Sequence, residues 1–380
     1  MVIDKHAIKE NVRRMVVKVG SNVLTCEEGL NLPVIDALSR QIEQLIVGGQ
    51  EVILVSSGAL AAGVRKLAIA KRPEAIPARQ AVSAVGQAGL ILTWEKAFAR
   101  YEKKVAQMLL TAEDMTNRQR YLNARNTLNT LLAWGVLPII NENDTVMVDE
   151  IRFGDNDNLA AVIALLMDAD ILINLTDIDG LYDRDPRTHE DARLIPEIKT
   201  ISKAIERYAG AIPGALGTGG MLSKIKAARK VTAAGIPMII ANGKTDRVLE
   251  TIFSGGPGGT FFQPKTERLS SRKCWLAFSL KPKGTIQIDD GAVRAITTGG
   301  KSLLPSGIAG VSGQFSVGDP VQFARQDGQV LGNGLVNYNS SDIIKIKGLR
   351  SSEIADCLGE KPYDEVIHRD NLVLTAVTLN

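Results

Sequence analysis

A glycine-rich stretch that ends in a lysine is the first candidate for chemistry in this chain. Residues 216–224 read LGTGGMLSK, and a helical pattern follows the glycines without a break. Glycine lets backbone N–H groups approach an anion closely, and a helix N-terminus carries about half a positive charge. Lys224 lies about one turn into that helix. We therefore expect this loop and the Lys224 ammonium to bind a phosphate group.

A second lysine stands near the end of a predicted strand. Residues 15–19 read MVVKV, an apolar run interrupted only by Lys18, and Gly20-Ser21-Asn22 follows as a turn. In open α/β sheets, ligands bind at the edge formed by the carboxyl ends of the strands. We therefore place Lys18 at the ligand-binding edge.

Two clusters of carboxylates and amides lie between these lysines. Residues 140–144 read INEND at the end of a strand, and residues 154–158 read GDNDN at the start of a helix. Helix capping explains single residues such as Asp155 or Asn158, but it does not explain both clusters. The pattern does not favour a calcium-binding EF-hand loop, because Ala160 stands where the loop requires glycine.

Further polar residues follow two other predicted strands. Ser57 comes after a buried strand, but Val55 replaces the first glycine of a hydrolase elbow, so we expect Ser57 to bind a carboxylate or phosphate. Thr176 and Asp177 end the strand at 171–175 and precede a long polar loop. Neither glycine-lysine segment is a Walker P-loop, since Met238 replaces the first glycine of one and the serine precedes Lys224 in the other.

Strands and helices alternate along most of the chain. We predict strands at 15–19, 51–55, 105–110, 136–140, 171–175 and 237–241, and helices at 33–47, 80–101, 118–134, 159–166, 221–234 and 247–253. This alternation predicts an α/β fold with three layers, in which helices cover both faces of a mostly parallel sheet.

The pattern changes after the glycines at 255–259. From about residue 281 the predicted strands are short, and Asp-Gly and Asn-Gly pairs separate them, as in a small β-barrel. We expect an α/β domain at residues 1–258, a linker at 259–280 and a barrel-like domain at 281–380.

Composition excludes several classes of protein. The chain has 380 residues and a net charge of +3, which is too mild to indicate nucleic acid or a membrane surface. The three cysteines and three histidines are scattered, so no zinc site or disulfide framework is predicted. No apolar run is long enough to span a membrane and no signal peptide is recognisable. We expect a cytoplasmic protein.

Phosphoryl transfer is the reaction that suits these residues best. It requires in-line positioning and positive charge around the transferred group, and little covalent participation by the protein. Lys18 and Lys224 on either side of that group would stabilise the charge that develops on its oxygens. We expect magnesium to be held largely by the nucleotide phosphates and water, with no dedicated protein ligands.

In order and spacing, these motifs resemble the glutamate 5-kinases of the amino acid kinase superfamily. The resemblance rests on five segments, VVKVGS at 16–21, VSSGA at 55–59, INEND, GDNDN and GTGGMLSK at 217–224. The sequences SLLPSGI at 302–308 and GD at 318–319 are similar to the PUA domain that many bacterial members carry. INEND together with GDNDN is specific to glutamate 5-kinases within the superfamily.

The resemblance implies ATP-dependent phosphorylation of the glutamate side chain, the first step of proline biosynthesis, with feedback inhibition by proline. It also implies a homodimer or homotetramer. It assigns catalysis to Lys18, Lys224 and Asp157, which would hold the two ammonium groups in place. Glutamate would bind to Ser57, Asp144 and Asn156, and ATP to Lys18, Thr176, Asp177, Thr218, Gly219, Gly220, Met221, Leu222, Ser223 and Lys224.

The residues agree with these roles. Glutamate carries one ammonium and two carboxylates, so its site needs acceptors such as Asp144 and donors such as Ser57. No general base is required, because a γ-carboxylate is already ionised near pH 7.

Three alternatives remain open. Another kinase of this fold, acting on acetylglutamate, aspartate, carbamate or a nucleoside monophosphate, would share the two lysines and the glycine loop. A PUA domain could bind RNA, but residues 281–380 hold ten Lys and Arg against eleven Asp and Glu, whereas RNA-binding surfaces are basic. A dinucleotide-dependent oxidoreductase would need G-x-G-x-x-G after the first strand, where VKVGSNVL stands instead.

Overall fold

The computed structural model describes residues 8–27, 29–146, 156–210, 220–256, 258–264, 270–278 and 280–374. The chain divides into two compact units, Met1–Arg268 and Leu269–Asn380. The segment predicted as a linker contains strand β10 (Thr260–Phe262), which lies in the sheet of the first unit, and helix α12 (Ser271–Phe278) of the second.

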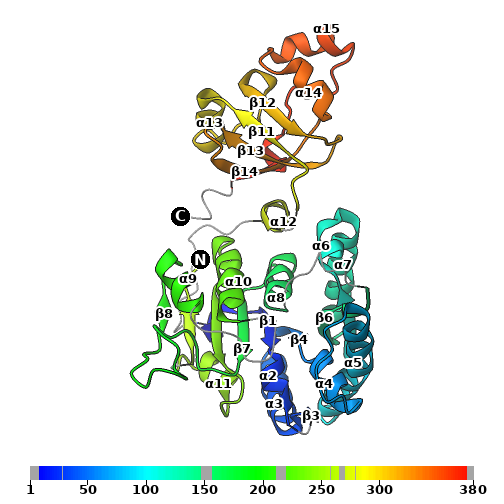
Figure 1. The fold of residues 1–380 in the computed structure, drawn as a ribbon, viewed down its shortest axis with the longest axis vertical. Helices are drawn as coiled ribbons and strands as arrows, with labels where there is room; N and C mark the ends of the chain where they lie inside the picture. Colours follow the sequence, from blue (N-terminus) through cyan, green and yellow to red (C-terminus); the bar gives the residue numbers. More distant parts are fainter. Residues whose placement is uncertain are drawn as a thin grey trace. The chain divides into compact units, whose positions relative to one another are not determined.

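The first unit is built on an eight-stranded sheet (Figure 1). In order across the sheet, the strands are β5 (Val105–Leu110), β6 (Leu137–Glu142), β4 (Glu51–Ser56), β1 (Arg14–Val19), β7 (Ile171–Thr176), β9 (Met238–Asn242), β10 and β8 (Glu197–Ile198). The first six are parallel, and β10 runs antiparallel to β9. The prediction of a mostly parallel α/β sheet is therefore confirmed.

The order of the strands marks where a ligand should bind. From β1 the chain first forms strands on the β4 side, and it then crosses to β7 on the other side of β1. Such a reversal opens a crevice at the carboxyl ends of the two strands that flank it. Lys18 lies near that end of β1, directly opposite Asn174 of β7 in the strand register.

Helices cover both faces of this sheet (Figure 1). Apolar residues of α3 (Leu32–Val47), α5 (Ile76–Ala99) and α11 (Val248–Phe253) form one core with alternate residues of the strands. On the opposite face, α8 (Asn156–Leu166) packs on β1, β4, β6 and β7, and α10 (Met221–Ala233) packs on α8 and β9. α7 (Arg118–Ala133) packs against β6. Because side chains alternate along a strand, Lys18 points toward α8 and away from the large core.

Local signals in the sequence explain where several helices begin. Asn31 caps α3 by accepting a hydrogen bond from the backbone N–H of Val34, and Asn117 caps α7 in the same way. α4 (Ala59–Lys66) and α5 cross with almost no space between them. A Cβ atom at Gly63 would lie 1.9 Å from the Val82 carbonyl oxygen, and one at Gly86 would lie 1.9 Å from that of Ala59. Only glycine permits this backbone contact.

The remaining elements of the first unit are short. They are α1 (Ile8–Asn11), α2 (Ser21–Leu24), the hairpin strands β2 (Thr25–Cys26) and β3 (Gly29–Leu30), α6 (Ala112–Thr116), the 3-10 helix η2 (Asp144–Val146) and α9 (Lys203–Gly210). Among the described residues, no helix is long and apolar enough to cross a membrane.

The second unit contains a five-stranded mixed sheet. In order across the sheet, its strands are β12 (Ile308–Gly313), β11 (Gly284–Ile288), β13 (Pro320–Arg325), β14 (Val330–Leu335) and β15 (Leu372–Leu374). Its helices are α12, α13 (Asp290–Thr297), α14 (Ser340–Ile346) and α15 (Ile354–Leu358), with 3-10 turns η4 (Pro305–Gly307), η5 (Ser351–Glu353) and η6 (Arg369–Asn371). A separate apolar core fills this unit.

One turn predicted in this unit is a helix. The sequence Asp289-Asp290-Gly291 was expected to punctuate two strands, whereas the structure begins α13 at this point. Asp289 Oδ1 accepts a hydrogen bond from the backbone N–H of Ala292 at 2.7 Å, so the aspartate caps the helix. The Asp290-Gly291 pair occupies the first two positions of this helix, and Val293 and Ile296 stabilise the helix by packing into the core.

Candidate active site

Two lysines that lie far apart in the sequence meet at one carboxylate. Lys18 Nζ lies 2.5 Å from Asp157 Oδ1, and Lys224 Nζ lies 3.0 Å from Asp157 Oδ2. The Asp157 side chain is completely buried, and each lysine side chain is only 6% exposed. Strand β1, helix α8 and helix α10 each contribute one member of this cluster.

The surroundings of Asp157 keep it ionised. Burial alone would raise the pKa of its carboxyl group, but the charges of Lys18 and Lys224 lower it. Hydrogen bonds from Lys18 and Ser223 lower it further, and the pKa lies well below its usual range. Asp157 therefore stays negative at any pH near neutrality and holds both ammonium groups at the crevice.

Asn174 completes the contacts of this carboxylate, and sequence reasoning missed it. Its Nδ2 donates a hydrogen bond of 2.8 Å to Asp157 Oδ1, the same oxygen that lies against Lys18. Asn174 is completely buried in an otherwise apolar strand, and its Oδ1 has no hydrogen-bond partner among the described residues. An asparagine inside the run Ile-Leu-Ile-Asn-Leu was the signal that could have identified it, because a buried amide needs a polar partner.

Ser57 and Asn156 meet at the neighbouring strand end. Asn156 Nδ2 lies 2.8 Å from Ser57 Oγ and 2.8 Å from Asn141 Oδ1. Asn141 in turn donates to Gln87 Oε1 at 2.6 Å, which ties the pair to α5. Asn156 Oδ1 is buried and has no hydrogen-bond partner among the described residues. A ligand N–H donor would satisfy this oxygen, since an unpaired buried acceptor is costly.

Gly58 sets the direction of the chain at this point. Its φ of 104° lies in the left-handed region, which glycine adopts without strain. The backbone N–H of Ser57 donates to the Val19 carbonyl oxygen at 3.1 Å, so the end of β4 is tied to the end of β1. Ser57 is therefore held beside the strand that carries Lys18.

Asp144 lies in η2, directly after β6, and its side chain is half-buried. It stands close to a guanidinium group. Burial and the neighbouring Arg79 lower the pKa of Arg72, while the charge of Asp144 opposes them. The GDNDN residues 154 and 155 lie outside the described residues, whereas Asn156 and Asp157 begin α8.

Thr176 and Asp177 lie at the carboxyl end of β7, on the other side of β1 from Ser57. Thr176 Oγ1 donates to Asp177 Oδ1 at 3.2 Å, and Asn22 Nδ2 donates to Asp177 Oδ2 at 2.9 Å. Removal from water would raise the pKa of Asp177, but these hydrogen bonds and the Lys224 charge lower it. The Asp177 carboxylate therefore stays ionised at the end of β7, where the hydrogen bond from Asn22 links it to α2.

The glycine loop is described from Gly220 onward. Gly220 precedes the first turn of α10 and provides no side-chain cap, so the N-terminus of this helix is left to other acceptors. Met221 is buried, Leu222 is 37% exposed, and Ser223 Oγ donates to Asp157 Oδ2 at 2.7 Å. Thr218 and Gly219 lie outside the described residues.

Known proteins match both units. Residues 13–242 match the amino acid kinase family and residues 284–358 match the PUA domain. Glutamate 5-kinase of Syntrophus aciditrophicus (strain SB) is 51% identical, over 98% of this chain and 96% of its own length. The glutamate 5-kinase of Thermoanaerobacter sp. (strain X514) is 51% identical over 95% of this chain and 97% of its own. The glutamate 5-kinase of Geobacter sulfurreducens is 48% identical over 97% of this chain and 100% of its own length.

The chain belongs to the glutamate 5-kinase family. The resemblance inferred from the sequence motifs is thus confirmed. The amino acid kinase match begins one residue before β1 and ends with β9. It therefore includes every strand that contributes a residue to the candidate site. The PUA match runs from β11 to the end of α15.

Across the described ranges, no group of three or more His, Cys, Asp and Glu side chains could hold a metal ion. At the crevice, both oxygens of Asp157 contact ammonium groups. The chemistry of this donor set suits an anionic ligand better than a cation.

Proposed function

We propose that this protein transfers the γ-phosphoryl group of ATP to the side-chain carboxylate of L-glutamate, forming L-glutamyl 5-phosphate, the first step of proline biosynthesis. The observation that carries this function is the convergence of Lys18 and Lys224 on Asp157 at the carboxyl edge of the sheet. Membership of the glutamate 5-kinase family, with relatives that align over nearly the whole chain, supports the choice of acceptor.

Gly20 lies beside Lys18 on the nucleotide side of the proposed site. A Cβ atom at Gly20 would lie 3.6 Å from Lys18 Nζ and 3.3 Å from the Leu175 carbonyl oxygen, so glycine keeps the space beside this ammonium open. The N-terminus of α10 has no side-chain cap, so its backbone N–H groups could bind a phosphate. We assign ATP binding to Lys18, Thr176, Asp177 and the loop from Thr218 to Lys224.

Magnesium would accompany ATP and neutralise part of the phosphate charge. Because Asp157 is occupied by two lysines, we expect the ion to be held by phosphate oxygens and water. The protein side chains then act on the transferred group through Lys18 and Lys224.

The acceptor side matches the charges of glutamate. Ser57 Oγ and the N–H groups at the start of α4 can donate to a carboxylate. Asp144 can accept from the ammonium group, and the unpartnered Asn156 Oδ1 is a further acceptor. We propose that these three residues orient glutamate so that its γ-carboxylate faces the γ-phosphate.

The reaction needs no proton transfer from the protein. An oxygen of the γ-carboxylate attacks the γ-phosphorus, the bond from that phosphorus to the bridging oxygen breaks, and ADP leaves with the electron pair. Lys18 and Lys224 stabilise the charge on the equatorial and bridging oxygens, in a site that is dry enough to strengthen this attraction. Asp157, which accepts a hydrogen bond from Asn174, holds the lysines in position before ATP arrives.

We also propose that the first unit is the catalytic domain and that the PUA unit is structural or regulatory. Proline inhibition and assembly as a homodimer or homotetramer are what the family relationship suggests for this chain. Both stay predictions, to be measured by inhibition kinetics and by light scattering.

A coupled ADP-release assay tests the function directly. The full chain is given ATP and, in turn, glutamate, acetylglutamate, aspartate, carbamate or a nucleoside monophosphate. We expect turnover with glutamate and not with the other acceptors. Turnover of acetylglutamate without turnover of glutamate would contradict the proposal.

A further inference from the structure

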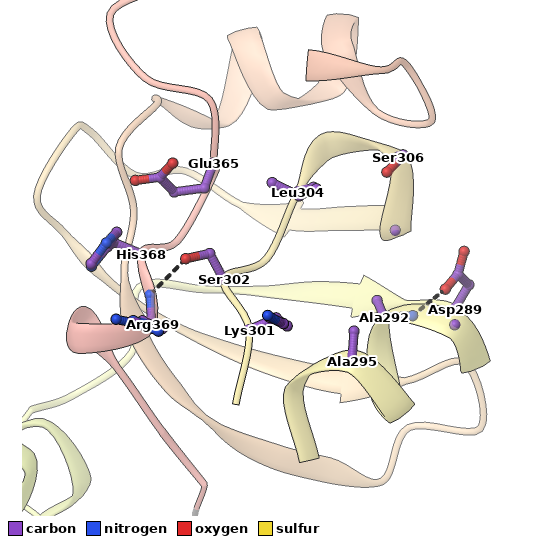
Figure 2. Close-up of a pocket in the computed structure, with 12 residues that line it drawn as sticks. Asp289, Ala292, Ala295, Lys301, Ser302, Leu304, Ser306, Glu365, His368 and Arg369 are labelled. Carbon is purple, nitrogen blue, oxygen red and sulfur yellow. Dashed lines mark hydrogen bonds between the residues drawn. The ribbon is translucent and has the colours of Figure 1, made fainter. Parts of the chain in front are cut away.

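The second unit contains a pocket of about 650 Å³ (Figure 2). It lies between helix α13 and two loop segments, 301–307 and 365–369. Its size falls within the range of small-molecule sites, about 300–1,000 Å³. The pocket shares no residue with the candidate active site.

Hydrogen bonds fix the walls of this pocket. Leu303 and Ile367 form an isolated antiparallel bridge, in which the Leu303 N–H donates to the Ile367 carbonyl oxygen at 2.9 Å. Next to it, the Arg369 N–H donates to Ser302 Oγ at 3.0 Å, as drawn in Figure 2. Because these bonds hold the two loop segments side by side, the pocket is formed before any ligand binds.

The pocket has an apolar part made of short side chains. Ala292 and Ala295 line it from α13, and Leu304 lines it from the facing segment with 43% of its surface exposed. A Cβ atom at Gly307 would lie 2.5 Å from the Cβ of Ala292, so the η4 turn approaches the helix closely. This surface suits a short aliphatic chain.

Three charged side chains line the pocket and have few partners in the protein. Within the described ranges, the Lys301 ammonium and the Glu365 carboxylate have no ion-pair or hydrogen-bond partner. In the part of the chain that the structure describes, Arg369 forms one long ion pair, with Asp370 at 3.9 Å. Asp289 also lines the pocket, but it is occupied in capping α13. Unpaired surface charges are common, but these two cations and one carboxylate gather around a single pocket that is partly apolar.

These charges specify the chemistry of the ligand. A ligand that carries two carboxylates and one ammonium on a short chain would neutralise all three, whereas a polynucleotide would meet a carboxylate. Residues 281–380 carry no excess of basic residues for a nucleic acid either. We propose that this pocket binds an acidic amino acid, with its carboxylates on Lys301 and Arg369 and its ammonium on Glu365. The pocket lining contains one lysine and not a pair like that of the candidate active site, so we expect no phosphoryl transfer there. The bound amino acid would act as an effector.

Equilibrium dialysis of the full chain with radiolabelled L-glutamate, without ATP, tests this proposal. We expect two sites per chain. Lys301→Glu should weaken one of them by on the order of tenfold or more, because it replaces an attraction by a repulsion. Glu365→Gln should weaken the same site, and excess glycine should compete poorly because it lacks the second carboxylate. Lys347→Glu, the same charge change on an exposed residue outside the pocket, is the matched control.

The outcomes separate this proposal from the catalytic one. If the dialysis showed one glutamate site whose affinity Lys301→Glu leaves unchanged, the pocket would not be an amino acid site. Two sites whose affinities are both unchanged in this variant would lead to the same conclusion. A single site that Lys301→Glu weakens and Asp144→Ala leaves unchanged would support the pocket and contradict the assignment of glutamate to the active site. Salt-sensitive binding of an RNA oligonucleotide that Lys301→Glu abolishes, without glutamate binding, would also overturn it.

Discussion

Strand β1 carries a charged cluster at each end, and the two clusters differ in almost every physical respect. At the amino end, Arg14 pairs with Glu51 at 2.7 Å, and both side chains are about a quarter to a third exposed. Asp170 accepts hydrogen bonds of 2.9 Å from the backbone N–H groups of Arg13 and Arg14. At the carboxyl end, the Lys18 and Lys224 side chains converge on a completely buried Asp157.

The difference shows how burial distinguishes a structural cluster from the candidate catalytic one. Water screens the amino-end pairs, whose contacts tie strand starts together. At the carboxyl end, two positive charges share one carboxylate with little water, so a net positive charge remains for an anionic ligand. Folding does not require that surplus, because a lone buried ion pair adds little stability. We propose that this surplus serves phosphate binding.

We expect the largest effect on kcat from Lys224→Ala. Removing one of two preorganised ammonium groups should lower kcat by on the order of 100-fold or more, as expected for the loss of an electrostatic donor in the transition state. Steady-state kinetics with saturating glutamate and ATP measure the effect.

Lys226→Ala is the matched control, because Lys226 lies on the same helix and is exposed. It should leave kcat unchanged. If Lys224→Ala changed only KM, the ammonium would bind the ground state and the transition state equally, and the catalytic role would be wrong.

A second test concerns the acceptor side of the carboxyl edge. Asp144→Ala should raise KM for glutamate by on the order of tenfold or more, because a hydrogen bond to a charged group is lost. KM for ATP should stay the same, which makes the nucleotide an internal control. Weaker ATP binding with unchanged glutamate binding would refute the assignment.

Asn174→Leu sharpens the comparison within the buried cluster. The change keeps the branched shape and the number of heavy atoms of the side chain but removes the hydrogen bond to Asp157, so Lys18 should be held less firmly. We expect kcat to fall by about fivefold with both KM values unchanged. Ile173→Leu, on the opposite face of β7, controls for packing in the sheet. An unchanged kcat would assign Asn174 a structural role only.

The smallest effect is expected at the amino end. Arg14→Ala should lower the free energy of unfolding by at most about 1 kcal/mol, because the pair with Glu51 is partly exposed. Urea unfolding measures this change, and kcat should be unaffected. A large loss of activity would mean that the two ends of β1 are not independent.

Sequence reasoning identified most of this site because its residues stand where simple rules place them. Lys18 interrupts an apolar strand, and Lys224 follows glycines at a helix start, so both were predictable from one strand and one loop. Their contact with Asp157 was available only through the family resemblance. No periodicity relates three residues on β1, α8 and α10, and the tertiary fold alone brings them together.

Other features depend on tertiary context in ways that local patterns do not contain. Asn174 looked like one residue of a buried strand, and its partner Asp157 lies on a helix that packs across the sheet. The Asp-Gly pair at 290–291 suggested a turn, although Asp289 caps α13. In both cases the deciding factor is a partner from another element.

The close contact at Gly63 and Gly86 limits how α4 and α5 can move relative to each other. With Cβ atoms at Gly63 and Gly86 excluded by opposing backbone, neither helix can shift without moving the other. The start of α4 lies beside Ser57, and α5 carries Gln87, which reaches Asn141. Widening the proposed glutamate site for a longer substrate would therefore require α4 and α5 to move together. Changes in the loops around the site are a simpler way to alter its specificity.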